Sequence, residues 1–359
     1  MVGDGYTPGV KIILPARNKK TTLNSRGAQM AAQLAERVVG QPESLDAIIP
    51  YVQMYQAGLS PEGRPIGIFL LLGPTGTGKT RTVEALAEVL HGSAKNVLRI
   101  DCGEYQMEHE VAKLIGAPPG YLGHRETQPA FTQVKLNAVM SERNNISIVL
   151  FDEIEKAAGS LQRLLLGVLD KGSLRLGDNS TVNFERSLIF LTSNLGAREM
   201  AREVRPEFGF EAGKVRSIDE GKGEVKRLEA VAVAAVKRKF APEFVNRIDL
   251  MLTYQSLNAG ALERILEMQV IGLQEHLDRR LGERSFTIDV PKRSRQFLLK
   301  HGTSVEYGAR ELKRTIHRFV MQPLAALVAE GAVPPDSTIR FEVSSNGKRL
   351  EICPVRLAA

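Results

Sequence analysis

Short apolar runs alternate with segments of helical periodicity through the middle of the chain. Four runs are mostly apolar or β-branched, as is typical of strands buried on both faces of a sheet, and they lie at 66–72, 97–100, 146–151 and 188–191. The segments between them place apolar residues on one helical face, as in Arg81 to Leu90. This alternation predicts an α/β domain whose parallel sheet has helices on both faces.

The two ends of the chain show other patterns. Helical periodicity appears at 25–37 and 41–57, and residues 1–36 are interpreted as an arm. After Asp249 and a short apolar run comes a long amphipathic helix, followed by the patterns of a strand, two helices and two strands at 286–290, 293–301, 309–330, 338–343 and 349–355. We therefore predict an arm at 1–36, a large α/β domain at 37–249 and a small mixed α+β domain at 250–359.

The strongest chemical signal directly follows the first apolar run. Residues 73–80 match the phosphate-binding pattern G-x-x-x-x-G-K-[ST] completely, between a predicted strand and a predicted helix. Glycines in such a loop let consecutive N–H groups converge on phosphate oxygens, a Lys reaches the β- and γ-phosphates, and a Thr ligates Mg²⁺. The predicted nucleotide-binding residues are Gly73, Pro74, Thr75, Gly76, Thr77, Gly78, Lys79 and Thr80.

Polar residues follow two of the later apolar runs. Asp152 and Glu153 come at the end of 146–151, which places two carboxylates at the carboxyl end of a central strand, where open α/β sheets bind ligands. We expect Asp152 and Thr80 to hold Mg²⁺ and Glu153 to polarise a water, the alternative being two acids that cap the next helix. Asn194 follows 188–191 and can orient that water, although by itself it is typical of a turn.

Composition limits the class of protein. The chain is 43% hydrophobic and 25% charged, no apolar run reaches the ~20 residues that cross a bilayer, and the N-terminus lacks signal-peptide order, so we expect a cytoplasmic protein. Cys102 and Cys353 form no disulfide or zinc pattern. The net charge is +7, and the basic residues that produce it are scattered along the chain, which favours a solvated surface over a nucleic-acid binding site. The basic residues from Lys222 to Arg227 read as part of a flexible loop at 211–229.

Eight motifs in a fixed order carry a resemblance to a known family. They lie at 38–41, 64–67, 73–80, 116–123, 152–153, 192–194, 242–249 and 307–310. In this order they resemble the Clp-type AAA+ ATPases, and most of all the second ATPase module of ClpB, ClpC and ClpA, over about residues 36 to 350. The resemblance implies a hexameric ring that hydrolyses ATP to thread and unfold protein. Since no other module of those proteins is visible in the chain, we expect a lone motor module.

The resemblance also implies roles for single residues. Asn194 would be the first sensor, and Arg310 the second sensor, contributed by the small lid domain. Arg247 would be the finger that serves the ATP of a neighbouring subunit, where a planar cation steadies charge on the phosphoryl group. Tyr121 would grip a polypeptide at the tip of a pore loop. The residues that would pack the adenine are Val38, Val39 and Ile265.

Alternatives stay open beside these roles. Without the family, Arg247 and Arg310 are typical of surface charges, and Tyr121 of a buried ring in a Gly- and Pro-rich loop. Two positions depart from the family's usual pattern. Residues 124–130 replace the acidic stretch that usually follows the pore loop, and Glu311 replaces the proline that commonly follows the second-sensor arginine. Residues 208–210, Phe-Gly-Phe, lack the usual aliphatic start of a ClpP-docking loop, so docking on a ClpP-like protease is not favoured but stays open, as does an adaptor.

Two functions of other classes also stay open. One is a nucleotide-switched assembly scaffold that never threads a substrate. The other is a nucleic-acid remodelling AAA+ ATPase, against which the absence of a recognisable DNA-binding domain in the sequence argues.

Overall fold

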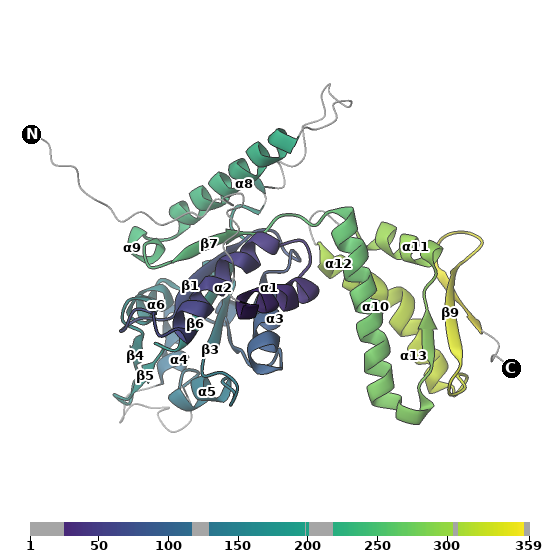
Figure 1. Cartoon of the computed structure of the whole chain (residues 1–359), viewed down its shortest axis with the longest axis horizontal. Helices are drawn as coiled ribbons and strands as arrows, with labels where there is room; N and C mark the ends of the chain where they lie inside the picture. Colours follow the sequence, from purple (N-terminus) through teal and green to yellow (C-terminus); the bar gives the residue numbers. More distant parts are fainter. Residues whose placement is uncertain (1–24, 117–128, 198, 201–217, 304–307, 355–359) are drawn as a thin grey trace, which may run out of the picture. The chain divides into compact units, whose positions relative to one another are not determined.

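The computed structural model describes residues 25–116, 129–197, 199–200, 218–303 and 308–354. The chain divides into two compact units (Figure 1). The first comprises Met1–Gly73 and Gly78–Tyr254, and the second comprises Pro74–Thr77 and Gln255–Ala359.

The first unit is built on a sheet of five parallel strands in the order β2-β3-β6-β1-β7. The strands are β1 (Gly67–Leu72), β2 (Leu98–Asp101), β3 (Ser147–Asp152), β6 (Ser187–Ser193) and β7 (Leu250–Thr253). Every residue of β1 and β6 is buried, which explains why these segments are apolar almost without interruption. The prediction of a parallel α/β sheet is confirmed.

Helices cover both faces of this sheet, because successive side chains of a strand point to opposite sides. Phe69 and Leu71 of β1 pack with α1 (Ser25–Arg37), α2 (Pro42–Gln56) and α3 (Lys79–His91). Ile68 and Leu70 belong to the opposite cluster, with α6 (Gly159–Lys171) and α8 (Ile218–Lys239). The shorter elements of this unit are α4 (Ala112–Ile115), α5 (Gln133–Ala138), α9 (Pro242–Val245) and the hairpin of β4 (Ser173–Arg175) and β5 (Thr181–Asn183).

Three features differ from the sequence-based expectations. The basic stretch from Lys222 to Arg227 is part of helix α8 rather than a flexible loop, because Leu228, Ala232 and Val236 recur on one buried helical face and the helix continues ahead of them. The sheet continues past Asp249, since β7 pairs with β1. The helical part of the arm is anchored in the first unit through Leu34, which is 1% exposed.

The second unit is a small mixed α/β domain, as predicted. Its sheet has the order β10-β9-β8, in which β9 (Thr338–Val343) pairs antiparallel with β10 (Leu350–Pro354) and parallel with β8 (Thr287–Asp289). The helices are α10 (Ala259–Leu281), α11 (Lys292–Gly302), α12 (Ala309–Ile316) and α13 (Gln322–Ala329). The predicted single helix at 309–330 is α12 and α13 joined by a π-helical turn, His317–Met321.

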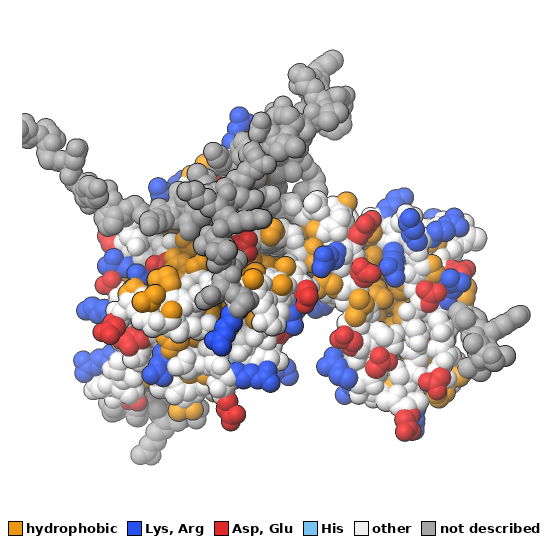
Figure 2. All heavy atoms as spheres, in the orientation of Figure 1, with side chains coloured by type: hydrophobic (Ala, Val, Ile, Leu, Met, Phe, Trp, Pro, Cys, Tyr) orange, Lys and Arg blue, Asp and Glu red, His pale blue; other side chains and the backbone are white. Residues whose placement is uncertain are grey.

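The surface carries charges of both signs. On the face that Figure 2 presents, Lys and Arg side chains are interspersed with Asp and Glu on both units. None of the helices in the described parts of the chain is long and apolar enough to cross a membrane.

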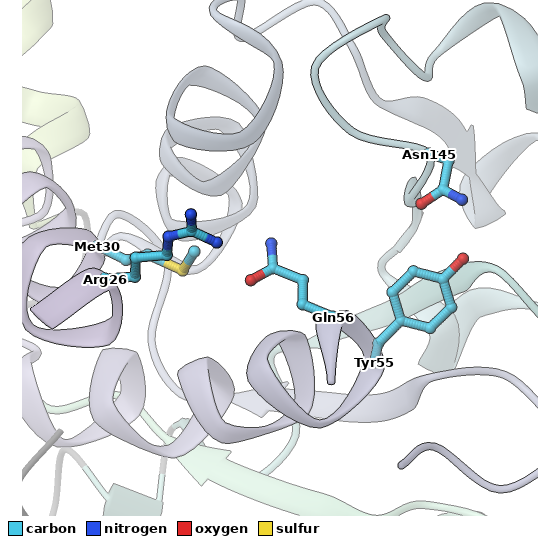
Figure 3. Close-up of a pocket in the computed structure, with 5 residues that line it drawn as sticks. All are labelled: Arg26, Met30, Tyr55, Gln56 and Asn145. Atoms are coloured by element: carbon cyan, nitrogen blue, oxygen red, sulfur yellow. The ribbon is translucent and has the colours of Figure 1, made fainter. Parts of the chain in front are cut away.

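A surface pocket of about 650 Å³ lies between α1, α2 and the residues before β3 (Figure 3). Arg26 and Met30 lie on one side of it, Tyr55 and Asn145 on the other, and Gln56 between them. None of the residues that the sequence predicts for nucleotide chemistry lines this pocket.

Tyr254, just after β7, anchors the end of the sheet to the start of α3. Its side chain is fully buried, and its hydroxyl donates to Thr82 Oγ1 at 2.8 Å. A Cβ at Gly73 would lie only 2.4 Å from the Tyr254 carbonyl oxygen, and Gly73 has a φ of 140°, so this close approach requires glycine.

We expect Tyr254→Phe to lower the free energy of unfolding by about 1–2 kcal/mol, because it removes a buried hydrogen bond while keeping the ring. Tyr55→Phe is the matched control, since its ring lines the surface pocket, and we expect a change within about 0.5 kcal/mol. Urea unfolding of both variants measures the difference. Equal stability of Tyr254→Phe and the parent would contradict the anchoring role.

Candidate active site

The predicted site residues come together at the carboxyl ends of three neighbouring strands. Lys79 follows β1 by way of the loop, Glu153 follows β3, and Asn194 follows β6, which lies between those two strands. Lys79 Nζ donates to Asn194 Oδ1 at 3.0 Å, and Asn194 Nδ2 donates to Glu153 Oε1 at 3.4 Å. Groups far apart in the sequence thus form one line of hydrogen bonds where open α/β sheets bind ligands.

The loop before α3 has the backbone geometry of a phosphate cradle. Gly76 and Gly78 have φ values of 76° and 104°, which other residues rarely adopt, and Thr77 Oγ1 donates to the Pro74 carbonyl at 2.9 Å. Gly78 is the N-cap of α3, so no side chain there covers the N–H groups of the first turn. A Cβ on Gly78 would meet nothing within 4 Å, which leaves open space beside these N–H groups. The loop therefore fits an anion such as phosphate.

Lys79 contributes a buried positive charge to this cradle. The residue is 8% exposed, and its Nζ donates to the Gly73 carbonyl at 2.6 Å as well as to Asn194. A cation attracts an anion more strongly in this setting than in water, because the surroundings screen it less. Thr80 follows in the first turn of α3 and is half-buried.

Asp152 is held from two neighbouring strands. The Thr192 hydroxyl on β6 donates to its Oδ1, and the Arg99 guanidinium on β2 donates to its Oδ2. The Asp152 side chain is 14% exposed. Because an ionised carboxylate has about four acceptor positions, both oxygens keep capacity for a cation or its waters.

Glu153 has a strained backbone with φ 57° and ψ 49°, in the left-handed region. Such a conformation costs a residue other than glycine roughly 1–3 kcal/mol. The Thr192 hydroxyl accepts a bond from the Glu153 N–H at 3.0 Å and so helps to hold it. Lys156 Nζ lies 2.5 Å from Glu153 Oε2, and its hydrogen bond and attraction to this carboxylate raise the pKa of Lys156.

Sequence reasoning missed several neighbours of these groups. Thr192 received no role of its own, although it lies two residues before Asn194, and strand periodicity places the two on the same side. Glu155 Oε1 accepts from the Asn194 N–H at 3.0 Å and fixes the backbone at that position. Arg99 and Lys156, the ion-pair partners of the two acids, lack any distinguishing pattern in the sequence.

The remaining predicted residues lie on other elements of the two units. Arg247 Nε pairs with Asp170 Oδ1 at 2.9 Å, and both side chains are close to half-exposed. Val38 is buried in the core beside α1 and α2, and Val39 is half-buried. Ile265 on α10 and Arg310 on α12 belong to the second unit, where Ile265 packs on its core and Arg310 is exposed. Tyr121 and residues 208–210 lie outside the described residues.

Two family descriptions match the chain. The family described as "AAA domain (Cdc48 subfamily)" matches residues 64–251. The family described as "C-terminal, D2-small domain, of ClpB protein" matches residues 257–341. Together they cover the sheet of the first unit, apart from the last two residues of β7, and most of the second unit.

Similar proteins include bacterial chaperones. The chain is 37% identical to chaperone protein ClpB of Rhizobium meliloti (strain 1021) over 318 residues, which are 89% of this chain and 34% of that protein. It is 38% identical to ClpB of Rhodopseudomonas palustris over 85% of this chain and 32% of the relative. The chain thus spans about a third of the length of these curated relatives.

Solved structures with a similar fold include Hsp104. A closed-state reconstruction of Hsp104 with ATPγS and FITC casein matches with a TM-score of 0.74 and 26% identity, over 94% of this chain and 53% of that one. The S. cerevisiae Hsp104:casein complex in an extended conformation matches with a TM-score of 0.75 and 25% identity, over 92% and 53% of the two chains.

We expect Glu153→Gln to retain ATP binding while hydrolysis falls by about 10²-fold or more, because an amide cannot take a proton from water. Lys79→Ala should instead weaken ATP binding itself, since it removes the buried cation. Equilibrium binding of a fluorescent ATP analogue and phosphate release separate the two effects. Turnover by Glu153→Gln at the parental rate would remove Glu153 from the role of base.

Proposed function

The chain belongs to the Clp-type AAA+ ATPases, and from this membership we propose that it binds Mg-ATP, hydrolyses it, and uses the free energy to remodel or unfold proteins as a ring in the cytoplasm. The observation that carries the proposal is the line of hydrogen bonds from Lys79 through Asn194 to Glu153. It joins a phosphate-binding cation to a candidate base through a group able to orient water.

Each group in the site has a distinct task in this proposal. The N–H groups of the loop and Lys79 bind the phosphates, while Val38, Val39 and Ile265 contact the adenine. Thr80 and Asp152 hold Mg²⁺, which neutralises charge on the phosphate oxygens. Glu153 takes a proton from the attacking water, which Asn194 orients, and Arg310 acts as the second sensor.

The ring part of the proposal rests on Arg247. In the isolated subunit Arg247 pairs with Asp170, and an ion pair between side chains this exposed contributes little to stability, about 0–1 kcal/mol. Arg247 can therefore leave this partner at a low cost. We propose that it completes the site of the neighbouring subunit in a hexamer, where it offsets charge on the phosphoryl group.

The proposed substrate is an unfolded stretch of polypeptide. Relatives of this chain are named as chaperones, and casein is named with both Hsp104 structures. Tyr121 supplies the proposed contact, because an aromatic ring offers an apolar platform that tolerates many sequences. The alternative functions are a nucleotide-switched scaffold and a nucleic-acid remodeller, and the experiments below distinguish them from the proposal.

We expect Arg247→Ala to bind ATP and to lose hydrolysis by on the order of 10³-fold, as for arginine fingers in general. Mixing it with Glu153→Gln tests action in trans, since each variant supplies what the other lacks. Turnover should reappear in the mixture and depend on the ratio of the two. If mass measurement shows mixed rings and turnover stays absent, Arg247 does not serve the neighbour.

We expect Tyr121→Ala to keep basal ATPase activity and assembly but to lose unfolding of a tagged fluorescent protein. ATP consumption and loss of substrate fluorescence are followed together, with the parent chain measured first. Equal unfolding by the parent and Tyr121→Ala would exclude threading through this residue. ATP-dependent assembly with no unfolding by the parent would favour the scaffold, and a salt-sensitive shift with duplex DNA would favour the nucleic-acid remodeller.

A further inference from the structure

One buried hydroxyl connects the two acids of the site. Thr192 is 1% exposed on β6, beside β3, and its Oγ1 is bonded to both Asp152 and Glu153. The Glu153 amide can only donate, so Oγ1 accepts there at 3.0 Å, and the hydroxyl hydrogen is left to donate to Asp152 Oδ1. The direction of both bonds is therefore determined by their chemistry.

We propose that Thr192 is a positioning residue of the ATPase reaction, which holds the metal-binding acid and the water-activating acid as one unit on the strand that leads to Asn194. This inference rests on the proposed ATPase function. It assigns Thr192 a task in catalysis although Thr192 is not itself placed against ATP.

The backbone of Glu153 shows why such a residue is needed. Its left-handed conformation is unfavourable for a side chain with a Cβ, so it persists only where neighbouring groups hold it. The bond from its N–H to Thr192 supplies a restraint on the backbone itself. The side chains of Asn194 and Lys156 contact the carboxylate, which can rotate about the side-chain bonds. On the backbone, the Lys156 N–H bonds the carbonyl of Glu153 at 2.9 Å, and Thr192 bonds its N–H.

Burial separates Thr192 from the other partners of the two acids. Arg99 and Lys156 have side chains 52% and 48% exposed, so water competes for their bonds. Thr192 is enclosed, and a hydrogen bond in such surroundings is stronger and its loss leaves polar groups unsatisfied. Thr192 therefore holds the two acids in place more firmly than either cation does.

The chain offers a matched control in the same two strands. Ser187 at the start of β6 is also fully buried, and its hydroxyl bonds that of Ser147 at the start of β3 at 2.7 Å. This cross-strand bond lies at the opposite ends of the strands from the acids. Ser187→Ala removes a hydroxyl bond of the same kind without touching the site.

The experiment compares Thr192→Val, which keeps the shape, and Thr192→Ser, which keeps the hydroxyl, with Ser187→Ala in the full chain. We expect Thr192→Val to lower kcat by about 10- to 100-fold and to raise the Mg²⁺ concentration at half-maximal rate, as outer partners of a metal site generally do. KM for ATP should change little. Thr192→Ser should restore most of the rate, and Ser187→Ala should match the parent.

Two further measurements do not depend on turnover. Amide hydrogen exchange at Glu153 should accelerate in Thr192→Val and return towards the parental rate in Thr192→Ser. Binding of a non-hydrolysable ATP analogue should require more Mg²⁺ in Thr192→Val. If the parent fails to hydrolyse ATP, the proposed function fails, while these two measurements still decide the role of Thr192.

Specific results overturn the inference. It is wrong if Thr192→Val keeps the parental kcat and Mg²⁺ dependence, if Thr192→Ser is as impaired as Thr192→Val, or if Ser187→Ala loses as much activity. Should Thr192→Val not yield folded protein, Thr192→Ala replaces it in the same comparison. Unchanged exchange at Glu153 in that variant would also overturn it.

Discussion

Burial of the central strands on both faces is the constraint on which the site depends. A strand enclosed in this way keeps a polar side chain only where a neighbouring group bonds it, as for Thr192, so charged groups collect where the strands end. β1, β3 and β6 lie side by side and parallel, and their carboxyl ends therefore deliver Lys79, Asp152 with Glu153, and Asn194 to one edge of the sheet. The same packing that stabilises the first unit brings these polar groups together.

The site combines strain with support. Glu153 has an unfavourable left-handed backbone conformation, and bonds of its N–H to Thr192 and of its carbonyl to the Lys156 N–H hold it there. Asn194 is held in turn by hydrogen bonds to Lys79, Glu153 and Glu155. Moving any one of these groups would therefore disturb the others. A rigid arrangement of this kind would reduce the reorganisation needed in the proposed proton transfer, which is how preorganised sites lower a barrier.

Some residues carry a structural role beside the proposed chemical one. Val38 is buried in the core with α1 and α2, so its replacement would affect folding as well as any contact with adenine. Arg247 has a partner within its own subunit, and its proposed action on a neighbour requires an exchange of Asp170 for phosphate. In both cases loss of activity alone would not identify the cause, and a separate measurement of folding or binding is needed.

The sequence by itself determined the four strands first predicted, the helices between them, and the phosphate loop, because each is encoded locally by periodicity or by glycine spacing. The sequence did not reveal that helix α8 includes Lys222 to Arg227, because the apolar face that supports the start of that helix lies further along the chain. The bonds from Thr192 to both acids, and the ion pairs of Arg99 and Lys156, were decided only by the tertiary structure. Strand order and register place these side chains within bonding distance, and neither is written in the spacing of residues along one chain segment.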